Sequence, residues 1–252
     1  MKTRWWLAAA AAFSVAGSGI AVAAPGLANQ VYSPYIKKGM TEVEVRGGRL
    51  TGGALNGEQS AIVELEHGVN DWLSLAVLAE FEQHAGEARK LDALAFEAVT
   101  YLGQIPGLGI DVGAYAEYEQ RIHNESGVLE TKLLLAKRAG DFEGLFNLIV
   151  TKPLTDKPGE GPTQLGYAAQ ATWLVANRLR LGAQAYGDLG TPRHFGGRQA
   201  HYLGPVARWE TRPKWLNGAE LELEAAYLLP AGAARHDTNG QVRFAVAYER
   251  RF

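Results

Sequence analysis

Apolar and polar side chains alternate with a period of two along most of the chain. Between residues 73 and 82 every second side chain is apolar, and Glu80 and Glu82 lie on the opposite face. The same pattern occurs in 42–46, 110–119 and 220–227. Strict alternation is typical of strands with two unlike faces, and no segment shows a convincing 3.6-residue period. The sequence therefore predicts an all-β fold.

The alternating segments number about twelve when each is given the roughly 10 residues of a membrane-crossing strand. The pattern is weakest in 91–102 and 142–152, where both faces hold apolar residues. The predicted strands are 40–50, 60–67, 71–83, 91–102, 109–121, 127–138, 142–152, 164–175, 178–189, 200–210, 219–229 and 240–252.

The links between these strands alternate in length. Outer-membrane barrels have short periplasmic turns and longer external loops. An even strand number then puts both ends of the barrel on the periplasmic side. The short links are 67–70, 138–141 and 175–178, with 104–107 and 211–218 somewhat longer; the long links are 51–59, 83–90, 152–162, 190–199 and 230–239.

The first 23 residues have the features of a secretory signal. Lys2 and Arg4 precede an apolar run over 5–22, and Ala-Val-Ala at 21–23 fits the cleavage pattern. A cut after Ala23 is preferred because a later cut would leave proline first. An uncleaved membrane helix is the alternative. We therefore expect a signal peptide over 1–23, a periplasmic lead over 24–38 and a transmembrane barrel over 39–252.

Composition narrows the class of protein further. The chain of 252 residues carries a net charge of −2, which becomes −4 once Lys2 and Arg4 are removed, so nothing favours nucleic acid as a partner. It has no cysteine, and an exported fold must then be held by packing and hydrogen bonds alone. No apolar stretch long enough for a membrane helix follows the signal.

The last strand ends on an aromatic residue. Val242, Phe244, Val246 and Tyr248 alternate toward Phe252, the final residue. A barrel in hydrocarbon must pair its last strand with its first, because unpaired backbone groups are costly there. This ending resembles bacterial outer-membrane barrels, in which an aromatic closing strand is read by the assembly machinery. The resemblance implies the cell outer membrane as location, with its lipid, its lipopolysaccharide and the assembly machinery as partners.

Two short motifs give a closer resemblance. Ser-Pro-Tyr-Ile-Lys-Lys-Gly at 33–39 and Tyr-Leu-Gly-Pro at 202–205 resemble the outer-membrane barrels named after phenol meta-cleavage pathways. This likeness implies passage of small organic compounds and supplies no catalytic residue or cofactor.

The predicted inner face is mostly acidic, which favours a water-filled pore that prefers cations. The alternative is a charge network that fills a narrow barrel, so that the protein conducts nothing and binds a partner or ligand through its external loops. The acidic positions are Glu42, Glu44, Glu64, Glu66, Glu80, Glu82, Glu97, Asp111, Glu117, Glu119, Glu130, Glu220, Glu222, Glu224 and Glu249. The basic positions are Arg46, Lys132, Arg180, Arg208, Arg243 and Arg251. Tyr248 and Phe252 are assigned to assembly.

Three further features are weighed against that interpretation. His-Asp-Thr-Asn-Gly at 236–240 resembles the His-x-Ser-Asn-Gly stretch of outer-membrane phospholipases, with threonine at the serine position, so a lipid hydrolase is the third hypothesis. Asn-Gly is also an ordinary hairpin turn. Four loop histidines could bind a metal if they converged: His84, His123, His194 and His236. Gly204-Pro205 predicts a bulge or kink, because proline cannot donate to a ladder.

We expect no enzyme, no cofactor and no metal, and leave the oligomeric state open.

Overall fold

The computed structural model describes residues 27–122, 126–155, 161–196 and 199–252, and it is built almost entirely of antiparallel strands. The described residues include short 3₁₀ turns, η1 (Lys214–Leu216) and η2 (Ala233–His236). None of their helices is long and apolar enough to cross a membrane. The strands are β1 (Met40–Thr51), β2 (Gln59–Gly68), β3 (Leu73–Gln83), β4 (Lys90–Ile105), β5 (Ile110–Arg121), β6 (Val128–Ala139), β7 (Phe142–Pro153), β8 (Gln164–Ala176), β9 (Leu179–Thr191), β10 (His194–Phe195), β11 (Ala200–Thr211), β12 (Glu220–Gly232) and β13 (Gly240–Arg251).

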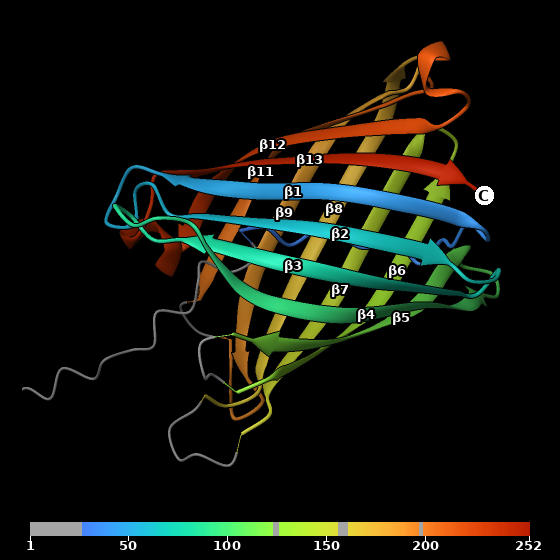
Figure 1. The fold of residues 1–252 in the computed structure, drawn as a ribbon. Helices are drawn as coiled ribbons and strands as arrows, with labels where there is room; N and C mark the ends of the chain where they lie inside the picture. The colour runs from blue at the N-terminus through green and yellow to red at the C-terminus, as the bar shows by residue number, and fades with distance from the viewer. Residues whose placement is uncertain (1–26, 123–125, 156–160, 197–198) are drawn as a thin grey trace, which may run out of the picture.

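The sheet closes on itself (Figure 1). Each long strand pairs with its neighbours in the chain, and β13 pairs with β1 from Met40 opposite Arg251 to Thr51 opposite Gly240. The N–H of Phe252 then donates to the carbonyl of Gly39 at 3.1 Å. The predicted closed barrel of twelve long strands is confirmed, with the two-residue β10 as an addition.

The predicted strand positions agree with the observed ones to within a few residues. The two weakest segments, 91–102 and 142–152, are β4 and β7. The largest differences are extensions, of β4 to Ile105 and of β12 to Gly232. The short turns lie at the end of the barrel that holds Gly39 and Phe252, which we call the short-turn end; the opposite end is the long-loop end.

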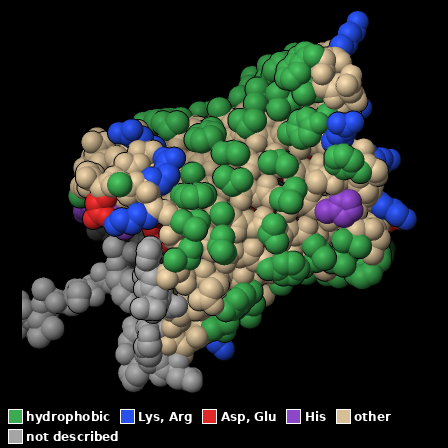
Figure 2. Space-filling model, in the orientation of Figure 1, with side chains coloured by type: hydrophobic (Ala, Val, Ile, Leu, Met, Phe, Trp, Pro, Cys, Tyr) green, Lys and Arg blue, Asp and Glu red, His purple; other side chains and the backbone are tan. Residues whose placement is uncertain are grey.

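Alternation gives the barrel an apolar outer wall. In β1, Val43 and Val45 are 43% and 40% exposed, whereas Glu44 and Arg46 are 6% and 3% exposed. Figure 2 shows apolar side chains spread over the middle of this wall and Lys and Arg side chains toward its two ends. This distribution is the one that a barrel needs in order to lie in a bilayer.

Residues 27–38, the described part of the predicted lead, lie inside the barrel. The backbone of Leu27 contacts Gly48 near the long-loop end, and that of Lys37 contacts Gly68 near the short-turn end. The segment therefore threads the lumen along its length, and we call it the plug. A periplasmic lead over 24–38 was predicted from the sequence, and this path through the lumen was not anticipated. The physical reason is that the inner wall carries apolar side chains, such as Leu50 and Leu145, that need cover.

Gly204-Pro205 does not form a bulge. Its partner strand β9 pairs through Pro205 opposite Ala183. On the other side the ladder to β12 stops after Leu203 and resumes at Val206 in the same register. Of the predicted bulge or kink, the extra residue of a bulge is therefore absent, and the missing proline donor coincides with a local gap in one ladder.

Deleting Phe252 should lower the amount of folded barrel. The closing seam, which is the pairing of β13 with β1, then loses the hydrogen bond from Phe252 to Gly39 and an aromatic ring. The measurement is the heat-modifiable band of the protein in an outer-membrane fraction. Phe252→Tyr, which keeps ring and backbone, serves as the control and should fold normally. Unchanged folded levels after the deletion would contradict a role for the terminal residue in assembly.

Candidate functional site in the barrel lumen

Strand register lines up carboxylates across the closing seam. Glu220 lies opposite Glu249, Glu249 opposite Glu42, and Glu42 opposite Glu66. One row of four glutamates thus crosses β12, β13, β1 and β2 at the short-turn end. Like charges in cross-strand positions destabilise a sheet, so this row needs nearby cations.

Two residues from outside the barrel strands supply positive charge to this row. Lys37 of the plug approaches Glu249 with 2.5 Å between Nζ and Oε2, and Arg212 donates to Glu220 at 2.8 Å. Burial opposes the charge on Lys37, but the hydrogen bond to Glu249 and the surrounding carboxylates outweigh it, so the pKa of Lys37 is raised above its ordinary value. The plug therefore helps to neutralise the seam.

Arg46 is the central basic residue of the lumen and is buried. Its guanidinium donates to Glu44 at 2.6 Å and also to Glu64. The remaining donors reach the plug: Nε bonds the carbonyl of Ala28 at 2.9 Å, and Nη2 bonds the hydroxyl of Tyr32 at 3.1 Å. One planar group thus joins two wall carboxylates to the plug, as the fork geometry of arginine allows.

Tyr32 is the main anchor of the plug at mid-barrel. Its N–H donates to the side-chain oxygen of Asn147 at 2.7 Å, and the amide of Asn147 donates to its carbonyl at 2.9 Å. Its hydroxyl donates to Glu97 at 2.9 Å. The ammonium of Lys132 lies 4.1 Å from its ring and 3.9 Å from that of Tyr115. Backbone, hydroxyl and ring are all engaged by the wall.

A second anchor lies nearer the short-turn end. The hydroxyl of Tyr35 donates to Asp111 at 2.9 Å, and the guanidinium of Arg138 lies 3.9 Å from the Tyr35 ring. Arg138 and Arg208 both donate to Glu143 at 2.6 Å. The plug is therefore part of a continuous polar network with β5, β6, β7 and β11.

A cavity of about 430 Å³ remains between the plug and the wall. It reaches the short-turn end, where the Lys37 side chain is 52% exposed. Eight carboxylates and six basic side chains line it. The acidic lining is Glu42, Glu44, Glu66, Glu210, Glu220, Glu222, Glu224 and Glu249, and the basic lining is Lys37, Arg46, Arg138, Arg208, Arg212 and Arg243.

Toward the long-loop end the interior is apolar. Leu27 and Val31 of the plug share one buried cluster with Leu50 of β1, Leu228 of β12 and Ala234 of η2. Burial of such side chains favours the packed state. The lumen is therefore filled at this end and hollow at the other.

Several predicted inner-face residues lie outside the cavity. Glu80 accepts from Ser60 at 3.1 Å, Glu119 accepts from Arg121 at 2.7 Å, and Lys132 approaches Glu130 at 3.0 Å. Other predicted residues with separate positions are Glu82, which lines a small hollow beside Leu27; Glu117, which accepts from Tyr115 at 2.6 Å; Arg180, which donates to the carbonyl of Asp141 at 3.1 Å; and Arg251, which is exposed at the end of β13.

The contacts between plug and wall were not predicted from the sequence, and so Tyr32, Tyr35 and Asn147 were not identified. Inward-facing glycines of the strands do mark the path of the plug. Gly48 and Gly113 alternate into the lumen, where any Cβ would collide with the plug: 2.2 Å from the carbonyl of Leu27 and 2.7 Å from Pro34. Glycine at such positions marks the close approach of another backbone.

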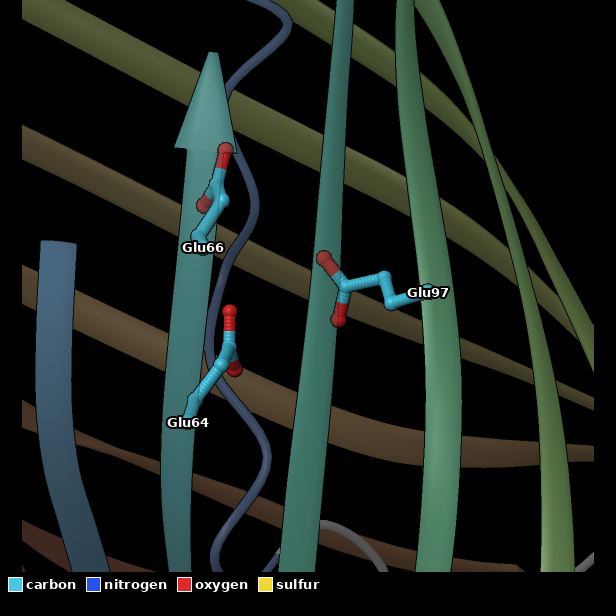
Figure 3. A group of neighbouring side chains, drawn as sticks. All are labelled: Glu64, Glu66 and Glu97. Atoms are coloured by element: carbon cyan, nitrogen blue, oxygen red, sulfur yellow. The ribbon is translucent and has the colours of Figure 1, made fainter. Parts of the chain in front are cut away.

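Within the described residues, the structure offers no supporting geometry for the other two hypotheses, a lipid hydrolase and a histidine metal site. The hydroxyl of Thr238 is buried and contacts the carbonyls of Thr51 and Gly240 at 3.0 and 2.8 Å, so it is not presented as a nucleophile. His84 lies 3.7 Å from Glu58, and His123 falls outside the described residues. Within the described part of the chain, no histidine is among the potential metal ligands that gather in a group of three or more. That group consists of the carboxylates of Glu64, Glu66 and Glu97 (Figure 3).

Comparison with known proteins agrees with the fold. No protein-family model matches the chain, and no curated protein matches it either. Among solved structures, the chain is similar to the COG4313 outer membrane channel from Pseudomonas putida F1, with a TM-score of 0.59, 14% identity, and coverage of 86% of this chain and 97% of that one. It is also similar to the KdgM porin in complex with disordered oligogalacturonate, with a TM-score of 0.53, 10% identity, and coverage of 84% and 99%. At these identities the likeness concerns the barrel fold.

Gly48→Ala should destabilise the protein by about 1–3 kcal/mol, the range for overpacking, because the new methyl group meets the backbone of Leu27. In an unobstructed strand the same change would stabilise. Urea unfolding in lipid vesicles measures the difference. Gly161→Ala, with open space around its Cβ, should change stability by less than about 0.5 kcal/mol. Equal stability of both variants would contradict a plug packed on β1.

Proposed function

We propose that this protein is an outer-membrane channel for small solutes, with a lumen that favours cations and with the plug as the element that restricts it. The observation that carries the proposal is the cavity of about 430 Å³ with its surplus of carboxylates. A low-dielectric wall focuses the field of such a surplus and raises the local concentration of cations.

The outer wall supports placement in the outer membrane. Its apolar side chains cover a closed barrel, and the structures similar to it are an outer membrane channel and a porin. Assembly machinery, membrane lipid and lipopolysaccharide are then the expected partners, and the signal over 1–23 is the expected route of export.

The lining favours one class of solute. The KdgM structure was determined with oligogalacturonate, a polyanion. Eight carboxylates against six basic groups in the present cavity would repel a polyanion. Small cations and neutral organic compounds are the solutes that this charge balance accepts, which agrees with the small organic compounds implied by the family resemblance.

A specific observation also favours a second function. The plug and the apolar cluster fill the long-loop end of the lumen, as they would in a barrel that conducts nothing and binds a partner through its external loops. The two functions differ in conductance. A channel conducts in a planar bilayer and conducts more when Gly48→Ala loosens the plug, whereas a filled barrel is silent in both forms.

The selectivity of the channel can be tested at three carboxylates of β12 that line the cavity, namely Glu220, Glu222 and Glu224. Changing them to glutamine should lower the cation preference while the barrel stays folded, since lumen substitutions tune selectivity. The preference of the parent protein should also fade as salt screens the wall. Reversal potential across a salt gradient is the measurement.

The matched control changes Glu80, Glu82 and Glu119 to glutamine. These residues face inward but do not line the cavity, so the same loss of charge should shift the reversal potential much less. Anion selectivity of the parent protein, or equal shifts in the two triple variants, would contradict the proposed role of the cavity.

A further inference from the structure

Two arginines lie on the outer face of the barrel at its long-loop edge. Arg49 of β1 is exposed and is in phase with the outward Val45. It lies opposite Gln59 of β2, which in turn lies opposite Gln83 of β3. The guanidinium of Arg89, just before β4, donates to the side-chain oxygen of Gln59 at 2.8 Å. Two exposed guanidiniums therefore adjoin one amide; we call Arg49, Gln59 and Arg89 the arginine edge.

No carboxylate of the described residues pairs with either arginine. The guanidinium of Arg89 has the neutral amide of Gln59 as its partner. The guanidinium of Arg49 has no ion pair or hydrogen bond within the described part of the chain. The carboxylate of Glu87, in the same loop as Arg89, approaches Lys90 instead, at 3.1 Å. Two positive charges are thus left for a partner outside the chain.

The wall below the arginine edge is apolar. Two residues closer to the middle of the barrel, Gly47 lies opposite Ala61, and the pair is flanked by Phe244 of β13 and Phe81 of β3. Their small side chains make the wall low between two aromatic rings. Two residues along a strand span about 6.6–6.8 Å, so positive charge directly borders apolar surface. Figure 2 shows Lys and Arg side chains beside apolar ones at this end of the barrel.

The opposite edge of the same strands carries no such charge. At the short-turn end, β1, β2 and β3 present Thr41, His67 and Leu75 side by side on their outer face. The hydroxyl of Thr41 lies 2.9 Å from Nδ1 of His67. On these three strands the outward arginine therefore belongs to the long-loop end. Long loops are the external side of such barrels, where the outer leaflet of the membrane lies.

We infer that the arginine edge binds lipopolysaccharide, with the phosphate groups of its lipid A part on Arg49 and Arg89 and an acyl chain on Gly47 and Ala61. The planar guanidinium bonds phosphate oxygens in pairs. Lipid A carries its phosphates on the same sugars as its acyl chains, so one molecule can contact both the charged edge and the apolar wall below it. The inference rests on the outer-membrane location in the proposed function and not on conduction.

Native mass spectrometry of lipid adducts tests the site. The protein is refolded into a zwitterionic detergent that contains no lipopolysaccharide and is then titrated with lipid A. We expect a saturable adduct with phosphorylated lipid A. Lipid A without its phosphates, phosphatidylglycerol and inorganic phosphate should each bind at least about tenfold more weakly, because they lack either the charge-assisted bonds or the acyl chains beside them.

Matched variants locate the adduct on the barrel. Changing Arg49 and Arg89 together to glutamine should weaken lipid A binding at least about tenfold. Changing Lys137 and Arg250, two exposed cations of the short-turn end, removes the same charge and should leave binding within about twofold. Ala61→Phe keeps both arginines, fills the low part of the wall and should weaken binding about threefold. Heat-modifiable migration verifies that each variant is folded.

Three results would overturn the inference. Equal losses in the two double variants would mean attraction by overall charge. Equal binding of phosphatidylglycerol and lipid A would mean that the edge accepts any anionic lipid. Full binding by the Arg49 and Arg89 variant, or absence of a lipid A adduct in the parent, would mean that the arginine edge is only solvated. None of these results depends on whether the barrel conducts.

Discussion

Pairing of β13 with β1 is the constraint on which the rest of the structure depends. A sheet in hydrocarbon cannot leave an edge unbonded, so the chain must close, and the register of the seam follows from the closure. That register fixes which side chains meet in the lumen. It brings Glu42 between Glu249 and Glu66, and it thereby creates a concentration of negative charge that the strands alone do not balance.

The plug fills part of the interior of the twelve-stranded barrel and brings positive charge to its acidic wall. Such a barrel is wider than one that its own side chains fill and narrower than an open porin. The plug covers apolar wall positions with Leu27 and Val31, and it brings Lys37 to the acidic seam. Arg46 connects these roles, because its guanidinium contacts wall carboxylates and plug together. Loosening the plug should therefore change packing and electrostatics at once.

Most of the fold could be predicted from the sequence, because most strands alternate with a period of two and the closure condition allows few other arrangements. The inner face followed from the same parity. The plug could not be predicted in this way, since an irregular segment has no period, and its contacts with Asn147 and Glu97 join residues far apart in the chain. Gly48 marked the close approach, but a lone glycine in a strand has several explanations. The grouping of the carboxylates of Glu64, Glu66 and Glu97 could not be predicted either, because it depends on the register of three neighbouring strands.

Photo-crosslinking from position 32 in intact cells tests most directly whether the plug occupies the lumen. A photoreactive phenylalanine derivative in place of Tyr32 is predicted to react with the inner wall near Tyr115, Glu97 or Asn147, and mass spectrometry of the digested protein would find the link within one chain. The same group at Trp215, which is 76% exposed on the short-turn side, should give no link to these strands. If the probe at position 32 reacted only with solvent or other proteins, the plug would not occupy the barrel.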